Sequence, residues 1–493
     1  MITDADLAAY RFLGLLARTD DYPPKDGLYQ DYTYFSRTTL EKARGFWKKA
    51  VRLIRDGRGP DNVILYIHWP FCPSQCRYCF CSMTVPRSRA QMALYAESLK
   101  REMDAFKDVF AGVELASVYI GGGTPTFIPE EVLDGLFAHI HRTYKVREGA
   151  EVYVEASPAT LSEGVLAVLS RHGVNRITLG VQSRDPGVLR TVNRKGQTPG
   201  AVEAAWRRMA RTPGLIRDVD LMLGIERQDR LSFVRDLVWA IRRRADVIHI
   251  NSFDARRQTA FIRSGSRLPD AYWPEIEKSI RVAERLLEEA GYRISHYDLE
   301  AQVTDPAEKI LSDDPFELSS MLAVGKHGKA HAFGAAWYQH PCVTSKGWGA
   351  VRIPDFFYLP GSLEEEVRAY VVRSLCLHEK VSLKALRKFY HTGLEGAPSV
   401  LKPLEELEAR GKVAVGRDYV TLKAVDPADR LVWLKHLYHP DLVEALLRAH
   451  AREYKAFLGR HERERDSVLG ELALKAEGRS YHRVYYRRDH ALS

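Results

Sequence analysis

A chain of 493 residues is long enough for two or three domains, and 45% hydrophobic residues suffice for a sizeable buried core. No apolar run is long enough to cross a bilayer, so we expect no membrane contact. The net charge of +9 is spread over 73 basic and 64 acidic residues, which does not favour nucleic-acid binding. The nearest basic cluster, residues 479–488, is equally typical of a solvated tail or of a helix covering a neighbour.

Residues 1–60 are predicted to form an N-terminal helical arm. A helical pattern covers residues 5–17, and a polar, tyrosine-rich stretch follows it. A second helical pattern covers residues 39–55 and ends at the Gly-Arg-Gly-Pro sequence of residues 57–60.

Residues 61–300 alternate between short apolar runs and amphipathic helical runs, which is typical of βα repeats on a parallel sheet. The expected strands are residues 63–68, 117–120, 152–155, 176–180, 218–223 and 247–251. Six repeats predict an α/β fold with a partial, open (β/α)6 barrel of the TIM type. Ligands of such sheets gather beyond the carboxyl ends of the strands, and the motifs described below fall at those ends.

Four of the six cysteines lie directly after the first expected strand, and three of them, Cys72, Cys76 and Cys79, form a C-x3-C-x2-C triplet. Three closely spaced thiolates suit an iron–sulfur cluster, and three ligands for four irons leave one iron open to a substrate or cofactor. A zinc site that adds Cys81 is the alternative, but no second pair of cysteines exists to complete the usual structural arrangement. So few cysteines, with no signal peptide, disfavour a disulfide framework and suggest a reducing, cytoplasmic compartment.

This loop, preceded by Tyr66 and by Pro70-Phe71, resembles the signature of radical S-adenosylmethionine (SAM) enzymes. With Cys81 included, the pattern is similar to that of the oxygen-independent coproporphyrinogen III dehydrogenase-like (HemN-like) family. The resemblance implies that the triplet holds a [4Fe-4S] cluster, that SAM chelates its fourth iron, and that Cys81 is not a ligand. Cys81 and Tyr66 are the implied catalytic residues. A small-molecule substrate and an electron donor such as flavodoxin or ferredoxin are the implied partners.

Other motifs extend the resemblance along the barrel. They are Gly-Gly-Gly-Thr-Pro-Thr at residues 121–126, the glutamate that ends the third strand, Arg-Ile-Thr-Leu-Gly-Val-Gln at residues 176–182, an Asn-Arg pair and an aspartate of the fifth strand. The family's pattern assigns SAM binding to Tyr66, Gly122, Gly123, Thr124, Glu155, Gln182, Arg194 and Asp220.

Elementary chemistry supports several of these assignments and leaves an alternative to each. A glycine triplet after a strand lets the backbone approach a ligand closely, although a tight turn between strand and helix would give the same sequence pattern. Glu155 lies in a buried context and should meet a cation or a hydroxyl, although a structural salt bridge would serve as well. Arg194 could clamp a carboxylate through two parallel hydrogen bonds, or it could bridge two helices. Asp220 is expected to contact the ribose or the amino group of SAM.

The rest of the chain is predicted in three parts. Residues 301–360 form a barrel-closing, glycine-containing segment, in which His327 and His331 could reach one point, although hydrogen-bonded structural histidines are the commoner case. Residues 361–426 resemble a winged-helix accessory cap, and residues 427–493 read as a charged, helical tail. Cys342 and Cys376 are expected to be buried thiols.

Departures from the family bear on the reaction. Gly224-Ile225-Glu226 stands where the family has Gly-Leu-Pro, and residues 311–322 contain no counterpart of the glutamine-containing stretch that helps the porphyrinogen enzyme to hold a second SAM. We expect reductive cleavage of one or two SAM molecules to a 5′-deoxyadenosyl radical. Methyl or methylene transfer to a specialised metabolite, as in methyltransferases or cyclopropanases, is slightly favoured. The alternatives are oxidative decarboxylation of coproporphyrinogen III propionates and a haem-binding carrier.

Overall fold

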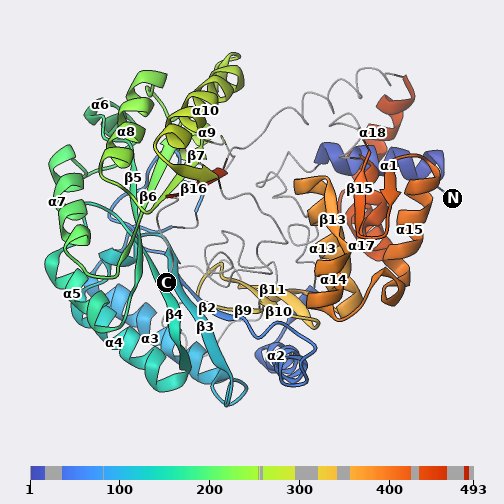
Figure 1. The fold of residues 1–493 in the computed structure, drawn as a ribbon, viewed down its shortest axis with the longest axis horizontal. Coiled ribbons are helices and arrows are strands. Elements are labelled where there is room, and N and C mark those ends of the chain that lie inside the picture. The colour runs from blue at the N-terminus through green and yellow to red at the C-terminus, as the bar shows by residue number, and fades with distance from the viewer. Residues whose placement is uncertain are drawn as a thin grey trace.

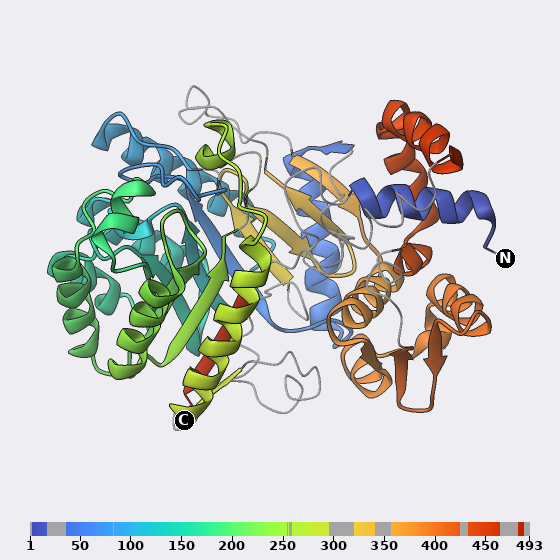
Figure 2. The same ribbon diagram turned by 90° about the horizontal axis from the view of Figure 1, so that it is seen from above.

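The computed structural model describes residues 2–16, 36–81, 83–253, 255, 259–294, 320–340, 356–423, 432–463 and 482–487. Two clusters of buried apolar side chains organise them, one around the large sheet and one among the N-terminal and C-terminal helices. Figures 1 and 2 show the two corresponding lobes, with the barrel at the left and the N-terminal and C-terminal helices at the right. Among the residues described, no helix is both long and apolar enough to span a membrane.

Six parallel strands pair in sequence order and form the barrel wall. They are β2 (Val63–Trp69), β3 (Glu114–Gly122), β4 (Lys145–Ala156), β5 (Arg176–Gln182), β6 (Ile216–Leu223) and β7 (Val247–Ser252). Each contains one of the six expected strands, so the predicted partial α/β barrel is confirmed. Their central residues are largely buried because helices cover the outer face, as parallel sheets require (Figure 1).

The covering helices lie outside the sheet in chain order. They are α3 (Arg89–Phe106), α4 (Glu130–Thr143), α5 (Glu163–Arg171), α6 (Pro186–Thr191), α7 (Pro199–Ala210), α8 (Arg230–Arg242), α9 (Ala260–Arg263) and α10 (Tyr272–Glu289), with the short 3-10 helix η1 (Pro125–Phe127) after β3. Side-chain oxygens of Ser88, Ser162, Asp185, Thr198, Asp229 and Thr259 cap the amino ends of α3, α5, α6, α7, α8 and α9. These local signals fix where each helix begins.

The barrel-closing segment continues the sheet beyond β2. Strand β9 (Ser320–Val324) pairs parallel with β2. Antiparallel strands β10 (Lys329–Ala332), β11 (Ala336–Gln339), β12 (Phe356–Pro360) and β1 (Ser36–Thr38) follow it across the sheet. The two histidines of this segment have separate roles: buried His331 lies 2.9 Å from Glu366 Oε1 and stacks on Trp337, whereas His327 occupies the turn after β9 with a φ of 61°. The structural interpretation therefore holds for His331.

The C-terminal tail is not wholly helical, which corrects the prediction for residues 427–493. Strand β16 (His482–Arg487) lies between β7 and β8 (Tyr292–Ile294) and pairs antiparallel with both. The basic cluster at residues 479–488 is therefore, in its described part, neither a solvated tail nor a helix. The reason is that an open barrel leaves β7 with unpaired backbone groups, and the alternating Arg-Val-Tyr-Tyr-Arg sequence can pair with them while burying Tyr485.

The second lobe has the element order expected of a winged-helix unit. It comprises α13 (Leu363–His378), β13 (Lys380–Ser382), α14 (Leu383–Tyr390), η3 (Leu394–Gly396), α15 (Pro398–Ala409), β14 (Val413–Val415) and β15 (Tyr419–Leu422), followed by η4 (Leu434–Leu437), α17 (Pro440–Ala449) and α18 (Ala451–Arg463). The three strands form one small sheet, in which β15 lies between β13 and β14. Cys342 and the Cys376 side chain lie outside the described parts.

The predicted N-terminal arm divides between the two lobes. Helix α2 (Leu40–Arg55) buries Trp47 against the barrel, where the indole Nε1 donates to the Tyr338 hydroxyl at 2.7 Å. Helix α1 (Asp4–Leu16) packs instead on the C-terminal helices, with the Phe12 ring centroid 5.0 Å from that of Tyr454 and 5.5 Å from that of Phe457. Residues 17–35 lie outside the described parts.

Candidate functional site

The cysteine loop leaves β2 at the carboxyl end of the barrel, and the end of β3 holds its first half. The Gly123 amide donates to Trp69 O at 2.6 Å, and the Thr124 amide donates to Phe71 O at 2.9 Å. The Cys72 amide donates to the Thr84 carbonyl at 3.1 Å. Cys72 is thus placed by backbone contacts that do not depend on a bound group.

The carboxyl end of α6 holds the second half of the loop. The Arg77 amide donates to Val192 O at 2.9 Å, and Asn193 Nδ2 donates to Gln75 O at 2.8 Å. The Ser74 hydroxyl donates to the Asn193 carbonyl at 3.2 Å. The Asn-Arg pair recognised in the sequence therefore supports the loop directly through its asparagine.

Two thiols of the triplet have polar neighbours, one a hydroxyl and the other a guanidinium. Cys72 Sγ lies 3.2 Å from the Thr124 hydroxyl, and Arg194 Nη1 lies 3.8 Å from Cys76 Sγ. Burial raises the pKa of the Cys72 thiol to about 12, and a hydrogen bond with Cys81 together with burial holds the pKa of Cys79 well above its ordinary value. Binding of a metal centre would have to displace these protons, because thiolates are the ligating form.

The donor set fits an iron–sulfur cluster better than a single ion. Across the described ranges, no three His, Cys, Asp or Glu side chains are grouped closely enough to hold one metal ion. A four-iron cube has different demands, because each thiolate binds a different corner. Three thiols on one loop, with a hydroxyl and a guanidinium beside them, meet those demands.

The glycine triplet makes room for the cysteine loop itself. A Cβ on Gly123 would lie 2.7 Å from Phe71 O and 2.8 Å from Trp69 O, and a Cβ on Gly122 would lie 2.6 Å from the His68 ring. Gly122 also has a φ of 106°, which disfavours other residues. Close backbone approach is therefore required here, and the approaching backbone is the loop that carries the cysteines.

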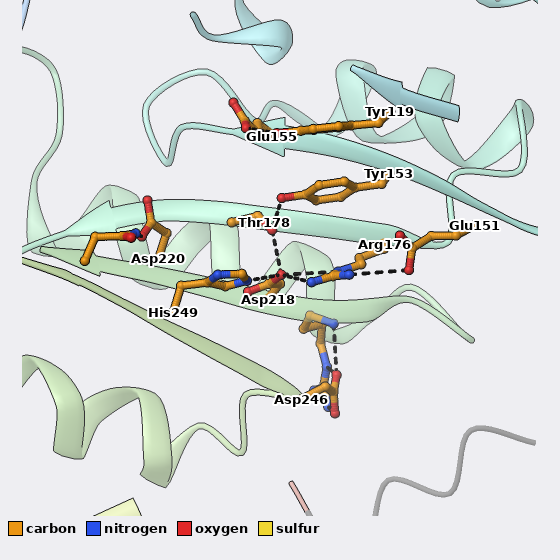
Figure 3. Close-up of polar contacts among 12 residues, drawn as sticks. Tyr119, Glu151, Tyr153, Glu155, Arg176, Thr178, Asp218, Asp220, Asp246 and His249 are labelled. Carbon is orange, nitrogen blue, oxygen red and sulfur yellow. Dashed lines mark hydrogen bonds and ion pairs between the residues drawn. The ribbon is translucent and has the colours of Figure 1, made fainter. Parts of the chain in front are cut away.

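Glu155 is partly buried near the same edge and meets a hydroxyl, as expected. It accepts hydrogen bonds from Tyr119 Oη and, at 3.1 Å, from the Gly122 amide. Burial raises the pKa of its carboxyl group, and these two bonds oppose the rise. The carboxylate thus joins the glycine-rich end of β3 to the end of β4. Figure 3 shows Glu155 and Tyr119 on these neighbouring strands.

Arg194 lies partly buried against the loop, and most of its N–H groups already donate hydrogen bonds. Nε donates to Gln197 Oε1 at 2.7 Å, Nη1 donates to Tyr78 Oη at 2.9 Å, and Nη2 donates to the Gly180 carbonyl. Burial alone would lower its pKa, but Tyr78 and Cys76 outweigh that effect and raise it. The predicted bidentate clamp does not fit this arrangement, because no two parallel N–H groups are left.

Asp220, in the middle of β6, and Gln182, at the end of β5, face each other. Gln182 Nε2 donates to Asp220 Oδ2 at 2.6 Å, and Asn251 Nδ2 donates to Asp220 Oδ1 at 2.5 Å. Gln182 has a φ of 63°, which is uncommon for a residue with a side chain and typical of functional sites. Its buried Oε1 has no hydrogen-bond partner among the residues described. A hydroxyl or ammonium group of a bound cofactor would satisfy that oxygen.

Residues 66–237 match the model of the radical SAM superfamily. Over 240 residues the chain is 31% identical to the oxygen-independent coproporphyrinogen III oxidase of Bradyrhizobium diazoefficiens. The aligned region covers 47% of this chain and 52% of that protein. Over 272 residues it is 26% identical to the Escherichia coli protein of the same name, with 54% and 59% covered. Residues 66–237 thus match the radical SAM superfamily, and the chain is similar to HemN-like proteins of that superfamily.

The solved structure of coproporphyrinogen III oxidase (HemN) from Escherichia coli superposes with a TM-score of 0.63, covering 82% of this chain and 95% of that one. Because the identity is only 20%, this likeness establishes the fold alone. A heme chaperone, HemW of Buchnera aphidicola, is 25% identical over 231 residues, which are 47% of this chain and 60% of that protein. The chain thus spans only about half the length of the curated relatives that it matches.

The barrel also contains a buried polar network that was not predicted from the sequence (Figure 3). Asp218 accepts hydrogen bonds from Arg176 Nη2 at 2.8 Å and from the Thr178 hydroxyl at 2.7 Å, and His249 Nε2 lies 3.0 Å from the same oxygen. Arg176 Nη1 also lies 3.4 Å from Glu151 Oε2. Polar residues at alternate positions of apolar strands were the signal that could have revealed these inward-facing side chains.

A ladder of tyrosines crosses the same interior from β2 to β4. The ring centroids of Tyr66 and Tyr119 lie 5.0 Å apart, and those of Tyr119 and Tyr153 lie 4.5 Å apart. The Tyr66 hydroxyl lies 2.9 Å from His68 Nδ1, and the Tyr153 hydroxyl lies 2.8 Å from that of Thr178. Of these residues, only Tyr66 was assigned from the sequence.

Proposed function

We propose that this chain is a radical SAM enzyme that holds a [4Fe-4S] cluster on Cys72, Cys76 and Cys79 and binds SAM beside it. The observation that carries the proposal is the placement of the cysteine loop. It is fixed by backbone hydrogen bonds at the carboxyl end of a parallel barrel, where ligands of such folds bind. The buried, unpartnered Oε1 of Gln182 at the same end supports a cofactor there.

When bound, the cluster supplies the electron that cleaves SAM to methionine and a 5′-deoxyadenosyl radical. The chain's own residues supply charge and position. The Arg194 guanidinium lies beside Cys76 and offsets the negative charge of the thiolates. The carboxyl groups of Glu155 and Asp220 complement the ammonium and sulfonium charges of SAM, and Gln182 offers it an acceptor. The covered barrel wall excludes water from the reacting atoms.

For the reaction, we propose oxidative decarboxylation of propionate side chains on coproporphyrinogen III or a similar tetrapyrrole. Relatives named coproporphyrinogen III oxidase, at 26–31% identity, favour this alternative over the alkyl transfer preferred from the sequence. The 5′-deoxyadenosyl radical would take a hydrogen atom from the propionate, and loss of carbon dioxide together with transfer of one electron to an external one-electron acceptor would leave a vinyl group. The basic excess of the chain suits such an anionic substrate. Cys81, exposed after the triplet, and Tyr66 are the proposed catalytic side chains.

Anaerobic incubation of the reconstituted protein with SAM, dithionite and coproporphyrinogen III tests this proposal. Mass spectrometry should find 5′-deoxyadenosine together with a vinyl product, and reduced flavodoxin or ferredoxin should replace dithionite. Cys81→Ser should retain iron and lose turnover, whereas alanine at the three ligand cysteines should abolish the cluster. A methylated product with S-adenosylhomocysteine would restore the alkyl-transfer alternative. Tight haem binding without SAM cleavage would favour a carrier like the relative named as a heme chaperone.

A further inference from the structure

The cysteine loop has one side-chain attachment that the proposed function leaves unexplained. Arg77 lies between Cys76 and Tyr78, and its guanidinium forms two hydrogen bonds to Glu226. Nε donates to Oε2 at 2.6 Å, and Nη2 donates to Oε1 at 3.1 Å. Glu226 stands at the proline position of the family's Gly-Leu-Pro. This departure from the family therefore supplies the carboxylate that binds Arg77.

The pair connects the loop to two elements that the backbone contacts of β3 and α6 do not reach. Glu226 lies in the turn after β6, three residues beyond Leu223. Arg77 Nη2 also donates to the hydroxyls of Ser264 and Ser266, at 3.0 and 3.2 Å, in the segment after α9. The Phe261 amide of α9 donates to Arg77 O at 3.0 Å. One residue of the loop thus touches both the turn after β6 and α9.

The geometry favours a firm attachment. The two side chains are 27% and 22% exposed, so solvent screens them only in part. Two hydrogen bonds from one planar guanidinium to one carboxylate fix direction as well as distance. Rotation of Arg77 would break both bonds, and rotation of the loop backbone would carry Arg77 away from Glu226.

We propose that the Arg77–Glu226 pair is a lock that positions the Cys76 and Cys79 thiols relative to β6. The inference rests on the proposed function, in which these thiols hold the cluster and β6 carries Asp220, a proposed SAM contact. By joining the turn after β6 to the residue that follows Cys76, the lock holds the two halves of the site at a constant separation. Arg77 and Glu226 are positioning residues, since neither is proposed to touch the substrate.

The test compares Glu226→Gln with Glu275→Gln. Glu275 pairs with Arg230 at the surface and is 49% exposed, so its substitution removes a carboxylate from an ion pair that does not include the loop. In reduced, cluster-free protein, maleimide labelling followed by peptide mass spectrometry gives the reaction rate of each cysteine. We expect Glu226→Gln to accelerate labelling of Cys76 and Cys79 at least fivefold. Cys72, which is held by the end of β3, should change less than twofold.

Iron release and rescue complete the design. After anaerobic reconstitution, Glu226→Gln should release iron to a chelator at least fivefold faster than the wild type or Glu275→Gln. In the charge-swapped variant Arg77→Glu/Glu226→Arg, the rate of iron release should return at least halfway from the Glu226→Gln rate to the wild-type rate. Arg77→Lys, which lacks the planar guanidinium, should release iron at an intermediate rate. Circular dichroism melting of each variant shows whether the fold is kept.

The outcomes separate the lock from the function on which it rests. Unchanged labelling in Glu226→Gln, with iron still bound, would overturn the lock and leave the proposed function intact. Equal acceleration at all three cysteines, with earlier melting, would overturn it as well, because general destabilisation would then explain the effect. Wild-type protein that binds no iron would refute the proposed function and the positioning of cluster ligands with it. Labelling of cluster-free protein would then still decide whether the pair restrains the loop.

Discussion

Gly123→Ala is expected to be strongly destabilising, although it adds only one methyl group. The new Cβ would lie 2.7 Å from Phe71 O, 2.8 Å from Trp69 O and 3.0 Å from Phe71 N. All three are backbone atoms of the segment that leads to Cys72, so no side chain can rotate away. Gly123 has no left-handed φ, so the cost is purely one of space.

The magnitude follows from two contributions. Overpacking of a tight site costs about 1–3 kcal/mol. Movement of the loop to relieve it would lengthen the Gly123-to-Trp69 and Thr124-to-Phe71 hydrogen bonds, and each such bond is worth about 1 kcal/mol. We therefore expect the free energy of unfolding to fall by about 2–4 kcal/mol, with Cys72 displaced.

Urea unfolding of cluster-free protein, followed by circular dichroism, measures this change. Gly45→Ala is the matched control, because a Cβ there meets nothing within 4 Å and Gly45 lies inside α2. Replacing a helical glycine by alanine should stabilise the protein by about 1 kcal/mol. If Gly123→Ala were as stable as the wild type, or shifted in the same direction as Gly45→Ala, the close-approach account of the glycine triplet would be wrong.

Three further predictions concern buried charges. Arg176→Met leaves the Asp218 carboxylate without its guanidinium and should lower the free energy of unfolding by about 3–5 kcal/mol in urea titrations; no loss would mean that the network contributes little. Burial raises the pKa of Asp236 from 3.8 to about 6, so the unfolded chain loses its proton first as pH rises. Stability should therefore fall by about 2 kcal/mol between pH 4 and 7, and Asp236→Asn should flatten that slope in parallel urea titrations. Arg194→Met should release iron to a chelator at least threefold faster, because Cys76 loses its neighbouring cation, whereas Arg190→Met, on the exposed face of α6, should not.

Much of the barrel was predictable because its signals are local. Strand and helix periodicities need only neighbouring residues, and the six parallel strands follow them. The cysteine triplet was equally easy to recognise from the sequence, because C-x3-C-x2-C places three thiols on one loop whatever surrounds that loop. The expectation that Glu155 meets a hydroxyl needed only the cost of burying an unpaired carboxylate.

The errors arose where distant segments meet. Residues 482–487 read as part of a charged tail, yet they pair with β7, because only the folded barrel exposes an edge strand for them to cover. The sequence suggested that Arg194 could clamp a carboxylate or could bridge two helices. In the structure, its N–H groups donate to the Tyr78 hydroxyl and the Gly180 carbonyl, because the cysteine loop lies against the end of β5. Helix α1 packs on the C-terminal lobe, because its apolar face contacts apolar side chains of a helix near the other end of the chain.

The sequence by itself determined which chemistry the chain could hold: three thiols on one loop, a glycine-rich strand end and acidic groups at the carboxyl ends of parallel strands. Only the tertiary structure decided what surrounds them. Arg77 and Glu226 are 149 residues apart, and Arg176 and Asp218 are 42 apart. No local pattern encodes such pairs, because they exist only after the strands have aligned in register around a common interior. Proximity among remote side chains is a property of the folded barrel, whereas donor type and spacing are properties of the chain.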